Sequence, residues 1–164
     1  MLIRNWMKSP VYTVKPYDSV AHARVLLAEH RFNQLPVVRG RNLVGIVTDR
    51  DLRDAPEMVA LSSLETGDKK QPSLPDPAEI RVEQVMTSNP VTLSGEDTIE
   101  QAARIMVRER IGSVPIVEQN HLVAILTRTD VLQAFLSASR TQKTGGSHDV
   151  AASRKSRPPR DSGS

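Results

Sequence analysis

The chain has 164 residues, of which 38% are hydrophobic, 25% are charged and only 3% are aromatic. This length suits one compact core or two small halves packed together. So few aromatic residues argue against a platform that stacks the bases of single-stranded nucleic acid. The absence of cysteine excludes disulfides, thiol nucleophiles and cysteine-ligated metals, and the four histidines lack the spacing of metal ligands.

The formal net charge of +3 is concentrated at the C-terminal end of the chain. Residues 140–164 contain six basic and two acidic residues, so residues 1–139 carry a net charge of −1. We therefore expect no specific nucleic-acid partner. No apolar run approaches the ~20 residues that span a bilayer, and the first ten residues lack the apolar region of a signal peptide. We expect a cytoplasmic protein with no membrane contact.

An internal repeat organises the sequence. A shift of 79 residues aligns residues 3–52 with residues 82–131 without a gap. We interpret the chain as a tandem duplication whose halves bury matching apolar faces against each other about a pseudo-twofold axis. The identical pairs include Met7/Met86, Thr13/Thr92, Asp18/Asp97, Ala23/Ala102, Arg31/Arg110, Pro36/Pro115, Thr48/Thr127 and Asp51/Asp130.

The first unit predicts the element order β-α-β-β-α. A brief strand at Tyr12–Val14 precedes a helix whose apolar face contains Val20, Ala23, Leu27 and Ala28. The apolar runs 35–38 and 43–47 are separated by a short polar turn and predict a hairpin. A final helix is expected to begin at Thr48.

The second unit predicts the same order, with a brief strand at 91–93 and a hairpin from 114–117 and 122–126. Thr98 and Gln101 have the spacing of a capping box at the start of its first helix. Its last helix is expected to begin at Thr127 and to carry an apolar stripe of Val131, Leu132, Phe135 and Leu136. The predicted fold class is α/β (α+β), with both repeats in one module.

Two further segments differ in composition. Residues 56–80 contain several prolines and one helical turn near Glu57–Leu64, which predicts a crossover linker docked loosely on the core. Residues 140–164 are rich in serine, glycine and basic residues, which predicts a disordered basic tail. The expected organisation is therefore repeat 1 at 1–55, linker at 56–80, repeat 2 at 81–139 and tail at 140–164.

The runs 35–52 and 114–131 resemble the signature of cystathionine-β-synthase (CBS) domains. In both runs an apolar strand with Pro36 or Pro115 leads through a turn to a second strand that ends in Thr-x-x-Asp. The chain is similar in layout to stand-alone bacterial two-CBS proteins, including the acetoin-utilization type. The resemblance implies a Bateman module whose clefts bind AMP, ADP, ATP or S-adenosylmethionine as regulatory ligands, with no required cofactor, and it implies a homodimer.

The Thr-x-x-Asp strings place chemistry at two junctions between strand and helix. Free N–H groups at a helix start attract anions, a threonine hydroxyl can donate to a phosphate, and a carboxylate can accept from ribose hydroxyls. Arg50 lies between Thr48 and Asp51, and Thr127 and Asp130 form the second string. The resemblance adds the first strands and the prolines as the adenine slot: Thr13, Val14, Thr92, Leu93, Pro36 and Pro115.

A second interpretation of each Thr-x-x-Asp string is a helix cap, in which hydroxyl and carboxylate only satisfy helix N–H groups. Both roles can coexist. Ala124 replaces Gly45, and Arg128 and Thr129 replace Asp49 and Arg50, so we expect unequal sites with Thr48 and Asp51 the more conventional. Arg31 and Arg110 are candidate phosphate partners, or only offset their helix dipoles.

Two functions remain open. The first is a regulatory module that binds an adenosine-containing ligand and signals in trans to a separate, unknown protein. The second is a structural dimerisation or scaffold module with vestigial nucleotide sites. We expect no enzyme, because the sequence shows no catalytic acid–base pair, no phosphate-binding glycine loop and no metal-ligand cluster.

Overall fold

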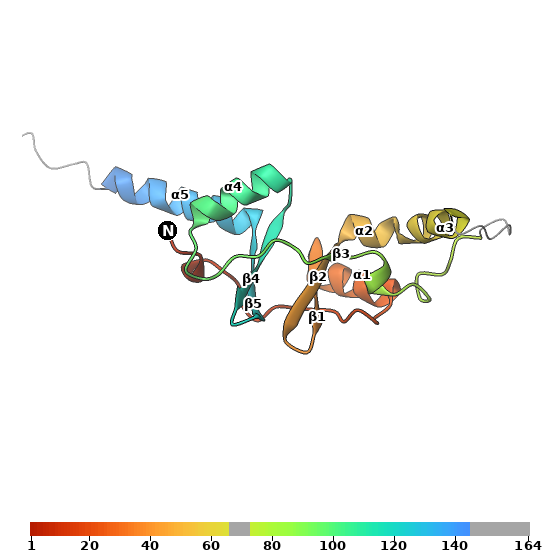
Figure 1. Cartoon of the computed structure of the whole chain (residues 1–164). Helices are drawn as coiled ribbons and strands as arrows, with labels where there is room; N and C mark the ends of the chain where they lie inside the picture. Colours follow the sequence, from red (N-terminus) through yellow and green to blue (C-terminus); the bar gives the residue numbers. More distant parts are fainter. Residues whose placement is uncertain (66–72, 145–164) are drawn as a thin grey trace, which may run out of the picture.

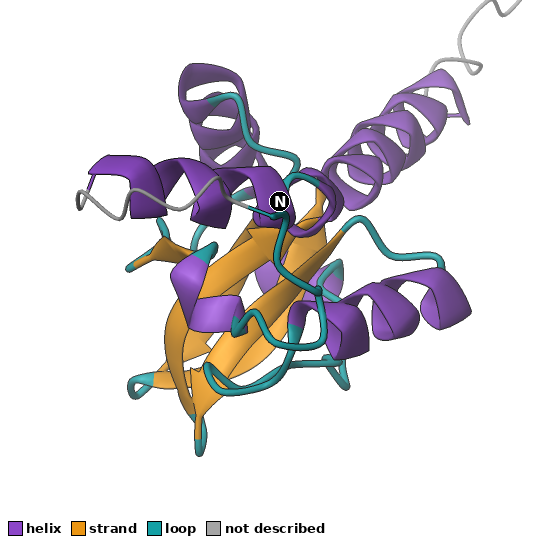
Figure 2. Cartoon of the chain, turned by 90° about the vertical axis from the view of Figure 1, so that its right-hand side faces the viewer, coloured by secondary structure: helices purple, strands orange, loops and turns teal. Residues whose placement is uncertain are grey.

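The computed structural model describes residues 1–65 and 73–144, and it confirms the mixed α and β fold with two repeats. The first half contains α1 (Val20–His30), β1 (Gln34–Arg39), β2 (Asn42–Thr48), α2 (Asp49–Arg53) and α3 (Ala55–Glu65). The second half contains β3 (Thr87–Ser88), α4 (Ile99–Glu109), β4 (Ser113–Glu118), β5 (His121–Thr127) and α5 (Arg128–Thr144). The strands lie at the centre and the helices surround them (Figure 2).

The two predicted hairpins are confirmed and have the same register. Strands β1 and β2 pair from Gln34 with Thr48 to Arg39 with Asn42, and β4 and β5 pair from Ser113 with Thr127 to Glu118 with His121. Each hairpin has one register shift, after Val37 and after Ile116. Because side chains alternate between the faces of a strand, each hairpin directs one apolar row to its own helices.

Each half has its own apolar core, but the segments before the first helices are exchanged. Ile3, in a short 3-10 helix (Ile3–Asn5), packs with Ile99 and Leu126 of the second half. Val82, in the equivalent 3-10 helix (Val82–Gln84), packs with Val20 and Leu52 of the first half. Figure 1 shows both segments crossing between the halves in opposite directions. The sequence repeats and the packing units therefore differ at their first turns.

A proline explains why the last helices of the two repeats differ. The first repeat has the short α2, a break at Asp54 and then α3, whereas the second has one helix, α5, that runs to Thr144. Pro56 corresponds to Phe135 in the 79-residue alignment. Proline lacks the N–H that a helix interior needs but is tolerated in a first turn, so the chain ends one helix and starts another.

Several details differ from the sequence-based expectations. The brief first strands are single bridges, Val14 with Val37 and Leu93 with Ile116. The expected linker begins with the three-turn helix α3, because only Pro56 in that stretch disfavours helix. Ala28 is exposed on α1.

The C-terminal helix also departs from expectation. Helix α5 continues through residues 140–144, which were assigned to the tail, and residues 145–164 lie outside the described part of the chain. Of the expected stripe on α5, Val131 is buried, whereas Leu132, Phe135 and Leu136 are exposed. The second buried apolar position on this helix is Ala134, because it follows Val131 by three residues and lies on the same face.

Candidate functional site

Both Thr-x-x-Asp strings lie where a hairpin ends and a helix begins, and both form caps. The backbone N–H of Thr48 donates to Asp51 Oδ2 at 2.9 Å, and the N–H of Asp51 donates to Thr48 Oγ1 at 3.2 Å. In the second string, the N–H of Thr127 donates to Asp130 Oδ2 at 2.8 Å and the N–H of Asp130 donates to Thr127 Oγ1 at 3.3 Å. The structure therefore shows the capping role at both junctions.

The carboxylate of Asp130 is held more tightly than that of Asp51. Asp130 is 1% exposed, and its Oδ1 accepts from the ammonium of Lys8 at 2.8 Å. Thr127 Oγ1 also lies 2.6 Å from Oδ2. Burial by itself raises the pKa of Asp130, but the hydrogen bonds from Lys8 and Thr127 outweigh burial and hold the pKa below its ordinary value of 3.8. Asp130 is therefore an ionised carboxylate at neutral pH.

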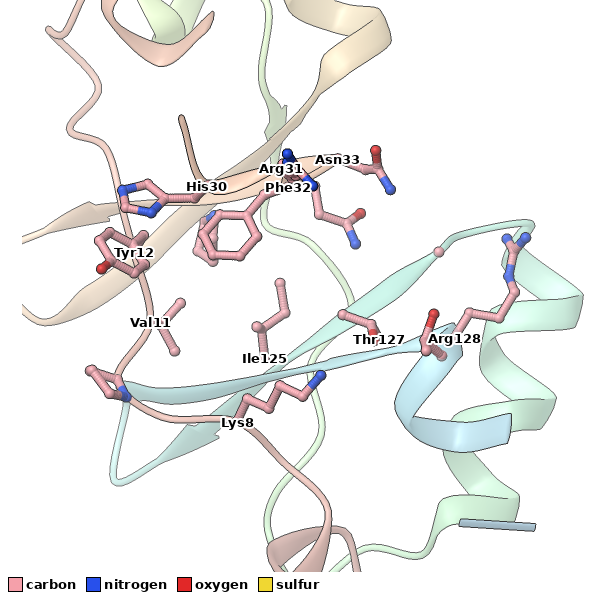
Figure 3. Close-up of a pocket in the computed structure, with 15 residues that line it drawn as sticks. Lys8, Val11, Tyr12, His30, Arg31, Phe32, Asn33, Ile125, Thr127 and Arg128 are labelled. Carbon is pink, nitrogen blue, oxygen red and sulfur yellow. The ribbon is translucent and has the colours of Figure 1, made fainter. Parts of the chain in front are cut away.

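A pocket of about 650 Å³ lies between the two repeats, beside Thr127 (Figure 3). Repeat 1 contributes Tyr12, Phe32 and Pro36, and repeat 2 contributes Ile125 and Thr127. The remaining lining residues are Lys8, Pro10, Val11, His30, Arg31, Asn33, Gln34, Gly112, Arg128 and Thr129. An occupant of this pocket would touch both halves of the molecule.

The pocket carries aromatic rings on one side and cationic side chains on both sides. The rings of Tyr12 and His30 have centroids 4.0 Å apart, and the rings of His30 and Phe32 are stacked at 5.4 Å. Figure 3 shows these rings on one side of the pocket, with Arg31 beside Phe32, and the guanidinium of Arg128 on the other side, with Lys8 below Thr127. The arrangement suits a molecule with a flat ring system and an anionic end.

The predicted adenine-slot residues are only partly brought together. Pro36 lines the large pocket, whereas Thr13 lines a smaller one of about 270 Å³ with Arg41 and Gly40. The side chain of Val14 is 1% exposed in the first core, its N–H donates to Pro36 O and its carbonyl accepts from Val38 N–H. These core positions do not offer a side chain to the pocket.

The equivalent residues of repeat 2 lie apart from this pocket. Leu93 packs against the second core, its N–H donates to Pro115 O, and its carbonyl accepts from Val117 N–H. Thr92 is exposed and Pro115 is buried. None of the three is among the residues that line the two pockets described above.

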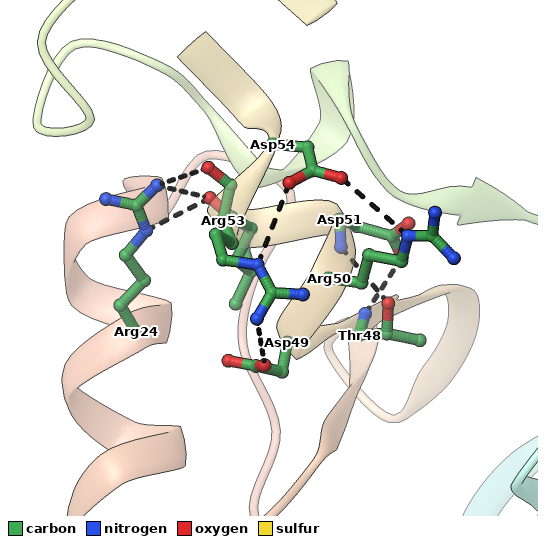
Figure 4. A network of polar contacts seen from close by, with 8 residues as sticks. Arg24, Thr48, Asp49, Arg50, Asp51, Arg53 and Asp54 are labelled. Carbon is green, nitrogen blue, oxygen red and sulfur yellow. Dashed lines mark hydrogen bonds and ion pairs between the residues drawn. The ribbon is translucent and has the colours of Figure 1, made fainter. Parts of the chain in front are cut away.

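The side chain of Arg50 pairs with a carboxylate at the end of its own helix, α2. Its Nε lies 3.8 Å from the carboxylate of Asp54, one turn along, and its side chain is 83% exposed. The neighbouring Arg53 faces Asp49, and Arg24 of α1 donates to the carbonyls of Leu52 and Arg53 at the end of α2 (Figure 4). This network satisfies the carbonyls left free where Pro56 interrupts the helix. Arg50 is thus directed toward Asp54 on the surface and is not among the residues that line the two pockets.

Sequence reasoning missed the residues that give the large pocket its character. Lys8, His30 and Phe32 were not singled out, and Arg128 was noted only as a departure from the first repeat. The alignment of the two repeats at a shift of 79 residues contained a signal. In it Lys8 is aligned with Thr87, His30 with Glu109 and Phe32 with Ile111, so the residue type differs at each position. Arg31 also lines the pocket; its φ of 54° ends α1 in the left-handed conformation, as Arg110 ends α4.

Metal clusters and membrane-spanning helices are absent from the described residues, 1–65 and 73–144. Within them, no cluster of three or more histidine, aspartate or glutamate side chains could hold a metal ion. None of the described helices is both long and apolar enough to cross a membrane.

Comparison with known proteins identifies the family. Residues 3–57 and 82–137 match the CBS domain, so the chain belongs to the CBS-domain family and carries two copies of the domain. An inosine-5'-monophosphate dehydrogenase from Korarchaeum cryptofilum is 38% identical over 122 residues, which are 74% of this chain. The match spans only 21% of that enzyme's length.

Two solved structures share the fold over nearly their whole length. CBSX2, a CBS-pair protein from Arabidopsis thaliana, was solved in complex with AMP; it is 29% identical, with a TM-score of 0.69 over 85% of this chain and 98% of its own. The CBS domain pair of protein MJ0100 was solved with 5'-methylthioadenosine and S-adenosyl-L-methionine. It is 26% identical, with a TM-score of 0.65 over 82% of this chain and 99% of its own.

Proposed function

We propose that this protein is a regulatory module that binds an adenosine-containing ligand between its two CBS repeats. The observation that carries the proposal is the pocket of about 650 Å³, which both repeats line and which ends at the Thr127 junction. A ligand there contacts both halves, so it favours whichever relative arrangement of the halves gives the better contacts. Such a difference in affinity is the physical basis of coupling to a second site.

The solved relatives support adenosine as the common part of the ligand. AMP, 5'-methylthioadenosine and S-adenosyl-L-methionine share adenine and ribose and differ at the 5' end. In this chain the Asp130 carboxylate is the group suited to accept from ribose hydroxyls, and Thr127 N–H and hydroxyl groups lie beside it. Pro36, Val11 and Ile125 provide the apolar wall for a base.

A second site at Thr48 and Asp51 belongs to the same proposal. Its support is the repeated cap geometry, with the same donor and acceptor atoms as in the second string. By the equivalence of the two repeats, this proposal includes Thr92 and Pro115 in the second site, as it includes Pro36 in the first. The two sites differ in charge, because Asp51 has no ion-pair partner among the described residues.

The test is a thermal-shift panel on the full chain with AMP, ADP, ATP, S-adenosylmethionine and GTP, followed by calorimetry. A ligand at 100 times its dissociation constant adds about 2.7 kcal/mol to the stability of the folded state. We expect adenosine ligands to raise the melting temperature and GTP to leave it unchanged. Asp130→Asn, which keeps a capping oxygen, should weaken binding, with Asp97→Asn as the control at a turn away from the pocket. No shift with any adenosine ligand would overturn the proposal.

The scaffold function is the second candidate, and helix α5 favours it. Leu132, Phe135 and Leu136 form an exposed apolar stripe at helical spacing, with 58%, 39% and 64% exposure. We propose that a second copy of the chain covers this stripe in a homodimer. The mass of the full chain in solution tests this, since a monomer at all concentrations would overturn it. A dimer is also compatible with ligand regulation, because an interface can transmit a change in either half to a separate partner protein.

A further inference from the structure

Lys8 connects the N-terminal segment to the buried carboxylate of repeat 2. Its backbone bridges to Ile125 of β5, and its side chain, 67% exposed, reaches the carboxylate of Asp130, whose side chain is 2% exposed. The ammonium of the exposed Lys8 side chain therefore lies against Oδ1 of the buried Asp130 carboxylate. Since the lysine stem rotates easily, this ion pair can open without disturbing the core.

The two oxygens of Asp130 have different partners. Oδ2 is used by the N–H and hydroxyl of Thr127, which belong to the helix cap. Oδ1 is bonded to Lys8. Because Asp130 is only 1% exposed and Lys8 lies at Oδ1, a ribose hydroxyl gains access to Oδ1 by displacing the ammonium, whereas the cap can stay in place. The displaced ammonium remains beside the pocket, because the Lys8 backbone is held on β5.

The charges around the pocket favour an anionic end group. Of its fifteen lining residues, Lys8, Arg31 and Arg128 are cationic and none is acidic. The Asp130 carboxylate, which follows the lining residue Thr129 in the chain, is paired with the ammonium of Lys8. AMP brings about two negative charges at neutral pH, adenosine brings none, and S-adenosylmethionine brings a sulfonium and an ammonium against one carboxylate.

We propose that Lys8 makes this pocket selective for phosphate-bearing adenosine ligands over uncharged or cationic ones. In the free protein its ammonium neutralises Asp130; in the complex the ribose takes Oδ1 and the ammonium pairs with the phosphate. Binding thus replaces the Lys8–Asp130 ion pair with a hydrogen bond from the ribose to Asp130 and an ion pair between Lys8 and the phosphate, which an uncharged ligand cannot provide. This inference rests on the proposed adenosine function and specifies which end group the site accepts.

The experiment is isothermal titration of the full chain with AMP, ATP, adenosine and S-adenosylmethionine. Hydrogen bonds to charged groups account for about tenfold or more in affinity, so we expect AMP and ATP to bind at least about tenfold more tightly than adenosine. In Lys8→Gln, whose amide can still donate to Asp130, the AMP affinity should fall about tenfold while the adenosine affinity does not fall. Lys8→Arg should retain the preference for AMP.

The control is Lys15→Gln, an exposed lysine that does not line the pocket, and it should leave all four affinities unchanged. An equal loss of AMP and adenosine affinity in Lys8→Gln would overturn the selectivity role and show a merely structural one. An unchanged preference in that variant would overturn it too. If the wild type binds adenosine as tightly as AMP, the inference falls and the adenosine function stands. If no adenosine ligand binds the wild type, both fall.

Discussion

The two junctions between hairpin and helix share a sequence pattern and a cap, yet their electrostatics differ. At the first junction Asp51 is half-buried and has no ion-pair partner among the described residues. At the second, Asp130 is buried and bonded to Lys8. The difference comes from outside the motif, because the crossing N-terminal segment carries Lys8 where the other crossing segment carries Thr87. The repeated motif thus determines the cap, and the segment that crosses from the other repeat determines whether the capping carboxylate has an ion-pair partner.

The crossing segments also differ in how closely they approach the hairpins. Residues Thr87 and Ser88 form β3 and pair with Ile46 and Gly45 of β2, whereas the equivalent segment makes a single bridge from Lys8 to Ile125. The methyl group of Ala124 contributes to the contrast, as does Pro10, which lacks the N–H that its equivalent Asn89 donates to Val44 O. The closer approach occurs against Gly45, and the looser one occurs where Ala124 occupies the same place.

The largest loss of stability is expected for Gly45→Ala, which gives β2 the same methyl group that β5 has at Ala124. A Cβ at this position would lie 2.5 Å from Met86 Sδ and 3.0 Å from the Thr87 carbonyl oxygen, so Gly45→Ala must move the Met86 side chain and shift Thr87 of β3 slightly away from β2. Overpacking of this kind costs about 1–3 kcal/mol of unfolding free energy, measurable by urea denaturation. The reciprocal Ala124→Gly introduces no clash and should cost about 1 kcal/mol, because it adds backbone freedom and removes a buried methyl group. Equal stability of wild type and Gly45→Ala would contradict the close approach.

The next effect sharpens the difference between the two aspartates. Asp130→Asn keeps a capping oxygen but removes the charge that Lys8 neutralises, which should cost about 1–2 kcal/mol at neutral pH. Because the folded pKa of Asp130 lies below the ordinary 3.8, its ionised form stabilises the fold above that pH, and the contribution is lost as the pH falls through the folded pKa.

The measurement is urea denaturation of wild type and Asp130→Asn at pH 7 and near pH 3. The gap between the two proteins should shrink at the lower pH. Asp51→Asn is the matched control and should show a smaller gap at pH 7, since Asp51 is half-buried and has no ion pair in the described structure. A constant gap for Asp130→Asn at both pH values would show that its charge does not contribute to stability.

Much of the fold followed from the sequence because its signals are local. The apolar runs 35–38 and 43–47, the Thr98 capping box and the repeat itself predicted both hairpins and the first helices. The exchanged first turns did not follow, because Ile3 and Val82 are equivalent apolar residues that could pack on either core. Choosing between the cores requires the path of the chain in three dimensions.

The candidate site was less predictable than the fold for the same reason. Thr127, Asp130 and Pro36 were found through a motif, whereas Lys8 reaches Asp130 across 122 positions of sequence and no local pattern marks it. The ring cluster of Tyr12, His30 and Phe32 likewise joins residues from both sides of α1. In the aligned repeats these residues stand out only as positions where the two repeats differ. The structure is needed to show which of those positions line the pocket.

The smallest effect is expected when the positive charge that Lys8 provides at the second junction is introduced at the first. Thr87 pairs with Ile46 as Lys8 pairs with Ile125, so Thr87→Lys should place an ammonium near Asp51. A double-mutant cycle with Asp51→Asn measures the coupling between the two groups by urea denaturation. Because Asp51 is only half-buried, we expect a favourable coupling of about 0.2–1 kcal/mol, the range of exposed ion pairs.

The matched cycle, Lys8→Thr with Asp130→Asn, should give a larger coupling, since the native ion pair involves a buried carboxylate. The pair of cycles separates two contributions to the contrast between the junctions. If both couplings are alike, the presence of a lysine accounts for the difference. If the native cycle shows a coupling and the Thr87→Lys cycle shows no coupling, a lysine at this position is not sufficient. Burial of the carboxylate is then also required, and the tighter pairing of β3 on β2 holds the new side chain away from Asp51.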